Sequence, residues 1–169
     1  RCLLSVARGS SDHVCTYLKY ASEIILGLPM ASVGPSVASV YDAALSTQGM
    51  VCFSVSQSGR SPDIVRMTER VGRGGAKTLA ITNDASSPLA GAAHEPLPIH
   101  AGPEVSVAAT KTFVSSLVAG LWVIAEMKAA AELIRAIHAL PAHLEAATQV
   151  DWSEVAQAVS TGTDFTIGR

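Results

Sequence analysis

Short apolar segments alternate with amphipathic ones through the first hundred residues of the chain. Five of the apolar segments have the length of strands: Leu3–Ala7, Met30–Val33, Met50–Ser56, Thr78–Thr82 and Leu97–Ile99. They are continuously apolar, as strands are when helices cover both faces of a sheet. The pattern therefore predicts a five-stranded parallel sheet.

Helical segments separate and follow the strands. We expect helices at Val14–Leu26, Val37–Leu45, Asp63–Val71, Val105–Met127, Ala130–Ala147 with a break near Pro141, and Trp152–Val159. The expected N-caps are Ser11 or Asp12, Ser36 and Ser61. Strands that alternate with helices predict an α/β fold, a doubly wound, flavodoxin-like sheet with right-handed crossovers.

Ligands of doubly wound sheets bind at the carboxyl ends of the strands, where the strand order reverses. For the order 2-1-3-4-5, this point lies between the first and third strands. The loops that follow these strands are Arg8–Ser11 and Ser56–Ser61, and both are rich in serine and glycine. We therefore place the candidate site between them.

The loop Ser56–Ser61 has two interpretations. Serine hydroxyls at a strand end, Gly59, and a helix that starts at once would form a phosphate cradle from hydroxyls and helix N–H groups. The same residues also make an ordinary capped turn. A neighbouring loop of similar design, Arg8–Ser11, favours the ligand, because a phosphate needs several converging donors.

Composition and charge exclude several classes of protein. The chain has 169 residues, 49% of them hydrophobic, which excludes disorder as the main state. Its net charge of −2 and the lack of a basic block argue against nucleic-acid binding. The longest uncharged apolar helical stretch, Thr112–Ala125, is shorter than the roughly 20 residues that span a bilayer, so we expect no membrane partner.

The cysteines and histidines do not suggest a metal site. Cys2, Cys15 and Cys52 are odd in number and include no CxxC, so we expect no disulfide framework and a reducing, cytoplasmic location. The five histidines form no HxH or HExxH pattern. We therefore expect no metal and no organic cofactor.

Three motifs carry a resemblance to a known family. Ser56–Asp63, which reads SQSGRSPD, resembles the SQSG-x-[ST]-x-D stretch of sugar isomerase (SIS) domains. Ala101–Phe113, which reads AGPEVSVAATKTF, resembles their AGxExxVAxTK segment, and Arg8–Ser11 matches their first ligand loop. The motifs stand in the family's order, and the likeness covers essentially the whole chain.

The resemblance implies a site for a hexose 6-phosphate such as fructose 6-phosphate or glucosamine 6-phosphate. The residues that match the phosphate-binding positions are Ser56, Gln57, Ser58 and Ser61. Those that match sugar-contacting positions are Ser10, Ser11, Val107 and Ala109. Ala109 departs from the family's aminotransferases, which usually have serine there.

The resemblance also implies a longer parent protein. Related isomerases, deaminases and aminotransferases have two SIS domains in tandem, with their catalytic carboxylate, histidine and lysine in or after the second. We expect residues 1–150 to be the first SIS domain, and 151–169 to be a linker helix and the first strand of the second, because FTIGR near the end resembles the opening LLSVARGSS. The expected function is aldose–ketose isomerisation or amino-sugar-phosphate deamination or amine transfer. The alternative is a sugar-phosphate sensor of a transcription regulator.

The apolar residues of the expected helix Val105–Met127 extend nearly all round its axis. A helix of this kind must be covered on every side. We expect pairing in a homodimer or tandem pseudo-dimer, and SIS domains of the family pair through helices. The alternative is a helix that lies at the centre of its own domain.

Overall fold

The computed structural model describes residues 2–105 and 109–162. The chain divides into two compact units, Arg1–Ile134 and Arg135–Arg169. The first unit contains the sheet and both predicted ligand loops. The expected strand at 164–169 and the sugar-contacting Val107 lie outside the described residues.

The first unit is built on a five-stranded parallel sheet. Its strands are β1 (Leu3–Val6), β2 (Met30–Ser32), β3 (Val51–Val55), β4 (Lys77–Thr82) and β5 (Glu95–Pro98). The order across the sheet is β2-β1-β3-β4-β5, with Leu3 paired to Met30 on one side and to Val51 on the other. The predicted doubly wound fold is confirmed, and β1 and β3 lie side by side as expected.

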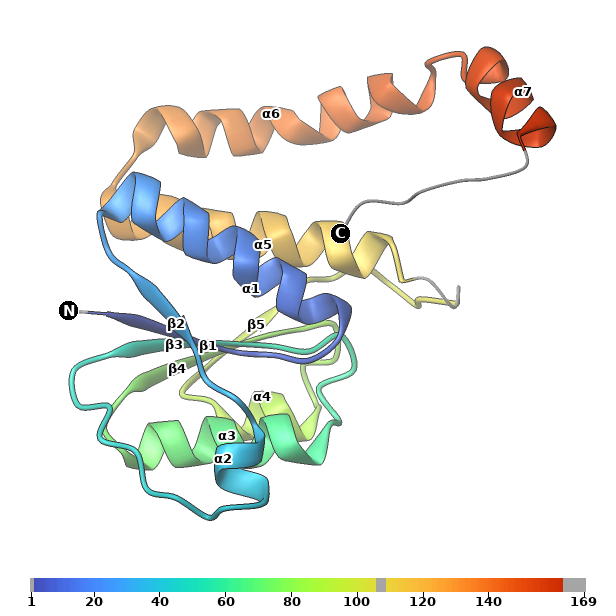
Figure 1. Cartoon of the computed structure of the whole chain (residues 1–169). Helices are drawn as coiled ribbons and strands as arrows, with labels where there is room; N and C mark the ends of the chain where they lie inside the picture. The colour runs from blue at the N-terminus through green and yellow to red at the C-terminus, as the bar shows by residue number, and fades with distance from the viewer. Residues whose placement is uncertain (1, 106–108, 163–169) are drawn as a thin grey trace. The chain divides into compact units, whose positions relative to one another are not determined.

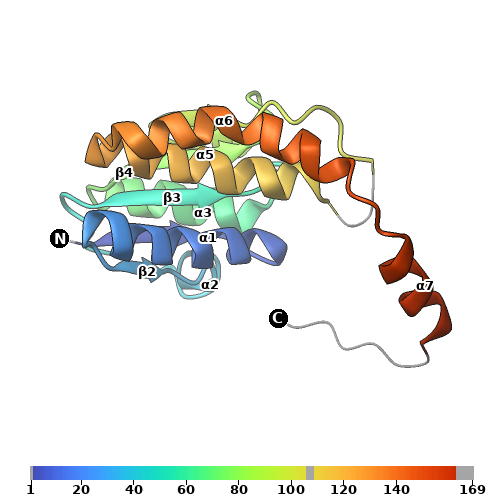
Figure 2. The ribbon, with the colours of Figure 1, turned by 90° about the horizontal axis from the view of Figure 1, so that it is seen from above.

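Helices cover both faces of this sheet (Figure 1). One face carries α1 (Ser10–Ala21), the π-helical turn η1 (Ser22–Leu26) and α5 (Lys111–Lys128). The other carries α2 (Ser36–Ser39), α3 (Pro62–Arg73) and α4 (Pro88–Ala92). From above, α1 and α5 run alongside each other (Figure 2), and the two helices are in contact.

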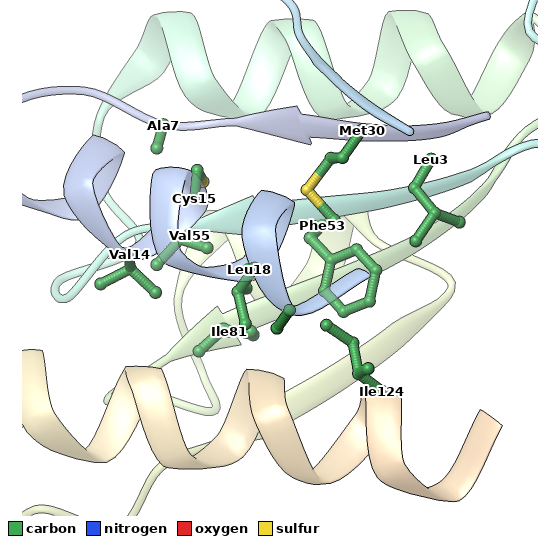
Figure 3. Packing of buried hydrophobic residues seen from close by; sticks show 11 residues of the cluster. Leu3, Ala7, Val14, Cys15, Leu18, Met30, Phe53, Val55, Ile81 and Ile124 are labelled. Carbon is green, nitrogen blue, oxygen red and sulfur yellow. The ribbon is translucent and has the colours of Figure 1, made fainter. Parts of the chain in front are cut away.

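The core between the sheet and the α1–α5 layer packs around Phe53, which is fully buried. Figure 3 shows its ring among Met30 from β2, Leu18 from α1 and Ile124 from α5. Burial of such side chains stabilises a fold by about 1.5–3 kcal/mol each relative to full exposure. This packing joins α1 and α5 to the sheet.

Three expected helix starts differ from the structure. The first helix begins at Ser10, and its N-cap is Gly9 rather than Ser11 or Asp12, because Gly9 has a φ of 60° that serine and aspartate rarely adopt. The second has Pro35 as its N-cap and is a single turn, followed by Asp42 in the left-handed region. The long helix begins at Lys111, six residues later than expected from Val105.

Other expectations differ in smaller ways. The fifth strand starts at Glu95 and carries Pro96 and Pro98, which suit an edge strand. The helix α4 was not predicted from the sequence. The predicted N-cap of α3 is confirmed as Ser61.

The chain ends in two further helices, α6 (Ala131–Thr148) and α7 (Ser153–Thr161). The expected break near Pro141 is wrong, because α6 continues through this residue. A proline inside a helix removes one backbone hydrogen bond, and here the other turns persist. Within the described ranges, none of the helices is both long and apolar enough to cross a membrane.

Candidate functional site

The candidate site lies where β1 and β3 end next to each other. After β1 the chain turns at Gly9, and Ser10 and Ser11 form the first turn of α1. The backbone N–H groups at the start of a helix have no partners within it, and they carry a partial positive charge. Ser10 and Ser11 therefore offer both hydroxyls and N–H groups to a ligand.

The loop after β3 is fixed to the end of β4 by backbone hydrogen bonds. The Ser56 N–H donates to Ile81 O at 3.1 Å, and the Asn83 N–H donates to Gln57 O at 3.0 Å. The Ser56 hydroxyl accepts from the Gly59 N–H at 3.2 Å, so this buried side chain shapes the turn. These hydrogen bonds hold the loop in one conformation against the end of β4.

Gly59 is a position that only glycine fits. Its φ of +62° lies in the left-handed region, and a Cβ would lie 2.6 Å from Ser87 Cβ and 2.9 Å from Thr82 Oγ1. The turn therefore packs directly against the start of α4. The Leu89 N–H, which donates to Gly59 O at 3.0 Å, completes this contact.

The N-terminus of α3 follows this loop. Ser61 is its N-cap residue and Pro62 its first residue, and within the described structure the Ser61 side chain makes no capping bond. The Ser58 hydroxyl, in contrast, accepts from the Arg60 N–H at 3.3 Å. The predicted residues Ser56, Ser58 and Ser61 thus lie in the loop before α3. The Ser61 hydroxyl does not cap the N–H groups at the start of this helix.

The two arginines beside these loops form ion pairs with carboxylates. Arg8 contacts Asp63 in the first turn of α3, and the Arg60 guanidinium lies 3.0 Å from Asp84 Oδ2. Hydrogen bonds from Ser86 and Arg60 lower the pKa of Asp84. Both arginines are exposed, so their charges are shared between a carboxylate and solvent.

A third segment reaches the site from the end of β5. Asn83 holds this segment by two hydrogen bonds, from its Nδ2 to Gly102 O at 2.8 Å and from the Ala101 N–H to its Oδ1 at 3.0 Å. Glu104 then turns back onto α5, where its Oε2 accepts from the N–H and the hydroxyl of Thr112, each at 3.0 Å. These hydrogen bonds, the Thr112 N–H first among them, lower the pKa of Glu104.

A small hollow, partly open to solvent, lies between these segments. We call it the hollow, and its lining residues are Ser10, Ser11, Val14, Gln57, Ala109, Thr112, Phe113 and Ser116. Four of the predicted site residues are thereby brought together: Ser10, Ser11, Gln57 and Ala109. Among the described residues, Ser56, Ser58 and Ser61 are not part of the lining but belong to the same loop as Gln57.

The sequence analysis missed the polar residues of the α5 side. Thr112 and Ser116 fall in the apolar helical stretch Thr112–Ala125, and no motif singles out Asn83. Glu104 stands in a quoted motif, yet its contact with Thr112 depends on the backbone turn between them. The spacing of four between the two hydroxyls, which puts both on one helix face, was the available signal.

The remaining reactive groups do not form a second site. Burial raises the pKa of the Cys15 and Cys52 thiols to about 12, so neither supplies a thiolate at neutral pH. Cys52 lies inside β3 as a buried thiol, and the side chains of His94, His100, His138 and His143 are exposed. Across residues 2–105 and 109–162, no cluster of three or more His, Cys, Asp or Glu could hold a metal ion.

Comparisons with known proteins agree with this geometry. A family model described as the SIS domain matches residues 2–127. Glutamine–fructose-6-phosphate aminotransferase [isomerizing] of Methanothermobacter thermautotrophicus is 35% identical over 168 residues, which is 97% of this chain and 28% of that protein. The chain thus spans little more than a quarter of that relative.

Solved structures share the fold. A protein from Silicibacter pomeroyi assigned to the phosphosugar isomerases is 58% identical with a TM-score of 0.90, over 94% of this chain and 49% of that one. The Vibrio vulnificus NanR protein complexed with ManNAc-6P is 19% identical with a TM-score of 0.65, over 88% of this chain and 57% of that one, a likeness of fold alone. Because the family model matches most of its length, the chain belongs to the SIS domain family.

Proposed function

We propose that this chain binds a hexose 6-phosphate, such as glucosamine 6-phosphate or fructose 6-phosphate, between the loops after β1 and β3. The observation that carries the proposal is the hollow, which gathers Ser10, Ser11, Gln57 and Ala109 from three separate segments. The names of the similar proteins, a fructose-6-phosphate aminotransferase and an assigned phosphosugar isomerase, support a ligand of this class.

The helix N-termini support a location for the phosphate. Three helices, α1, α3 and α5, begin at the carboxyl edge of the sheet, and a helix start attracts anions. The start of α5 already holds the Glu104 carboxylate. The N-cap residues of α1 and α3 make no side-chain capping bond within the described chain, although the Ile64 N–H in the first turn of α3 donates to Asp63 Oδ1 at 3.0 Å. We place the phosphate between the starts of α1 and α3, with Ser56, Gln57, Ser58 and Ser61 around it.

The proposed reaction belongs to the parent protein rather than to this domain alone. Proton transfer between C1 and C2 of the sugar needs a general base. The lining of the hollow, as far as the chain is described, contains no carboxylate and no histidine. We propose that a second SIS domain supplies these groups, that the parent isomerises or deaminates hexose 6-phosphates in the cytoplasm, and that this chain alone has no turnover.

Calorimetric titration with glucosamine 6-phosphate tests the binding proposal. We expect saturable binding to the wild-type protein, and a Ser58→Ala variant should bind about 10- to 150-fold more weakly, as for a lost hydrogen bond of about 1.5–3 kcal/mol to a charged group. The matched control is Ser46→Ala, an exposed serine before β3, which should bind as the wild type does.

Two results would contradict the proposal. One is a wild-type protein that binds no hexose 6-phosphate at millimolar concentration. The other is a folded Ser58→Ala variant with unchanged affinity, which would remove the phosphate from this loop. A sugar-phosphate sensor would also bind this ligand, so a turnover assay on the full-length parent separates the two functions.

A further inference from the structure

We propose that Thr112 is a specificity-determining residue, whose hydroxyl oxygen accepts a hydrogen bond from a hydroxyl or amine of the bound sugar. This inference rests on the proposed function. Thr112 lines the hollow from the first turn of α5, and its total exposed fraction is 1%. We infer that the part of this side chain that a ligand can reach is the part on the hollow.

The proton of the Thr112 hydroxyl already has an acceptor. Its partner is Glu104 Oε2 at 3.0 Å, and the hydrogen bonds around Glu104 keep this carboxylate ionised at neutral pH. An ionised carboxylate only accepts hydrogen bonds, so the hydroxyl must donate to it. The Thr112 oxygen then presents only lone pairs to the hollow.

Ser116, one turn further along α5, is oriented in the same way. Its hydroxyl donates to the Thr112 carbonyl at 2.7 Å. A carbonyl cannot donate, so the Ser116 oxygen is also left as an acceptor. The α5 wall of the hollow thus offers two hydroxyl oxygens and no hydroxyl proton from these residues.

The residues that line the hollow from α1 and from the loop after β3 supply hydrogen-bond donors. Ser10 and Ser11 contribute N–H groups of the first turn of α1, and Gln57 contributes a side-chain amide. Phosphate oxygens at neutral pH mainly accept hydrogen bonds, whereas sugar hydroxyls and amines can also donate. A phosphosugar satisfies both walls when its phosphate faces the α1 side and a donor of its sugar faces Thr112.

Titrations with two probes test this assignment. The probes are fructose 6-phosphate and inorganic phosphate, measured on the wild type and on Thr112→Val, which keeps the shape of the side chain and removes the acceptor. We expect fructose 6-phosphate to bind about tenfold more weakly to the variant, with inorganic phosphate unchanged. Thr112→Ser should retain the wild-type ratio of the two affinities.

The matched control is Thr68→Val, which removes another buried helical hydroxyl, on α3, that donates to Ile64 O and shares a second hydrogen bond with the Ser54 hydroxyl. If Thr112→Val fails to fold, the pair Thr112→Ser and Thr112→Ala gives the same comparison. Equal changes for both probes, or an unchanged ratio, would overturn the role of Thr112. A wild type that binds neither probe would instead overturn the proposed function itself, and this inference with it.

Discussion

At the scale of single residues, the site depends on a glycine that lets two loops touch. Gly59 combines a left-handed backbone with a close approach to Ser87 and Thr82. Each feature alone would favour glycine, and together they fix where the loop after β3 lies. The positions of Gln57 and Ser58 follow from this contact.

Gly59→Ala should therefore destabilise the fold strongly. We expect a loss of about 2–4 kcal/mol, because the left-handed strain adds to the clash with Ser87. Thermal or urea unfolding measures the loss. The matched control is Gly49→Ala, where φ is +74° but a Cβ would have no neighbour within 4 Å, so only the strain of about 1 kcal/mol applies. Equal losses for the two variants would show that the contact with Ser87 contributes nothing.

At the scale of elements, α5 has one narrow face that packs closely on α1. The buried positions Thr112, Ser116, Gly120 and Ile124 recur every four residues. At Gly120, a Cβ would lie 2.6 Å from both methyl carbons of Leu18, a side chain that is fully buried and has little room to move. The small residue allows α1 and α5 to approach each other.

We expect Gly120→Ala to lower the free energy of unfolding by about 1–2 kcal/mol. Overpacking against Leu18 costs about 1–3 kcal/mol, and the better helix propensity of alanine offsets up to about 1 kcal/mol. Gly91→Ala on α4 serves as the control, since its Cβ would meet nothing within 4 Å and the variant should be as stable as the wild type or slightly more so. A Gly120→Ala protein that is more stable than the wild type would contradict the close packing.

The start of α5 should give the domain a pH-dependent contribution to stability. Because the pKa of Glu104 is lowered in the fold, its contribution is fully present above the ordinary glutamate pKa of about 4.3 and is lost as the pH falls through the lower folded-state value. Glu104→Gln should therefore lower the melting temperature more at pH 7 than at pH 3.

Glu23→Gln, at an exposed glutamate of η1, is the control for the general titration of carboxylates. Its melting temperature should follow that of the wild type across the same range. The account of Glu104 fails if Glu104→Gln differs from the wild type by the same amount at pH 7 and pH 3.

Elements with a strong local signal were predictable from the sequence. The five strands were found within two residues at every end, because runs such as Met50–Ser56 are mostly apolar and β-branched or aromatic. The start of α5 was missed, because Val105–Thr110 has the composition of a helix while Glu104 folds back onto Thr112. A hydrogen bond between residues eight positions apart is not visible in the hydrophobic pattern of the sequence. For the same reason, the part of the hollow lined by α5 was not predicted.

At the scale of the whole molecule, exposed apolar side chains bear on the expected homodimer. Tyr20 and Ile24 are 61% and 80% exposed, and Tyr17 precedes them at helical spacing on α1 and η1. Large apolar side chains exposed on one segment favour association over a free monomer. The homodimer remains a prediction, and these residues are where it would be tested.

We expect sedimentation equilibrium at tens of micromolar to show a dimer for the wild type. The Ile24→Asp variant should have a higher dimer dissociation constant. The matched control is Val40→Asp, which adds the same charge at a residue that is 70% exposed, beside α2, on the other face of the sheet. It should remain as dimeric as the wild type. A wild type that stays monomeric over this range would contradict the prediction.

The central claim is that a phosphosugar binds between the loops after β1 and β3. A crystal structure of the protein with glucosamine 6-phosphate tests it most directly. The account predicts the phosphate within hydrogen-bonding distance of the Ser56–Ser61 loop at the start of α3, with the sugar in the hollow beside Thr112. A ligand bound elsewhere, or a fully occupied ligand whose phosphate points away from this loop, would contradict it.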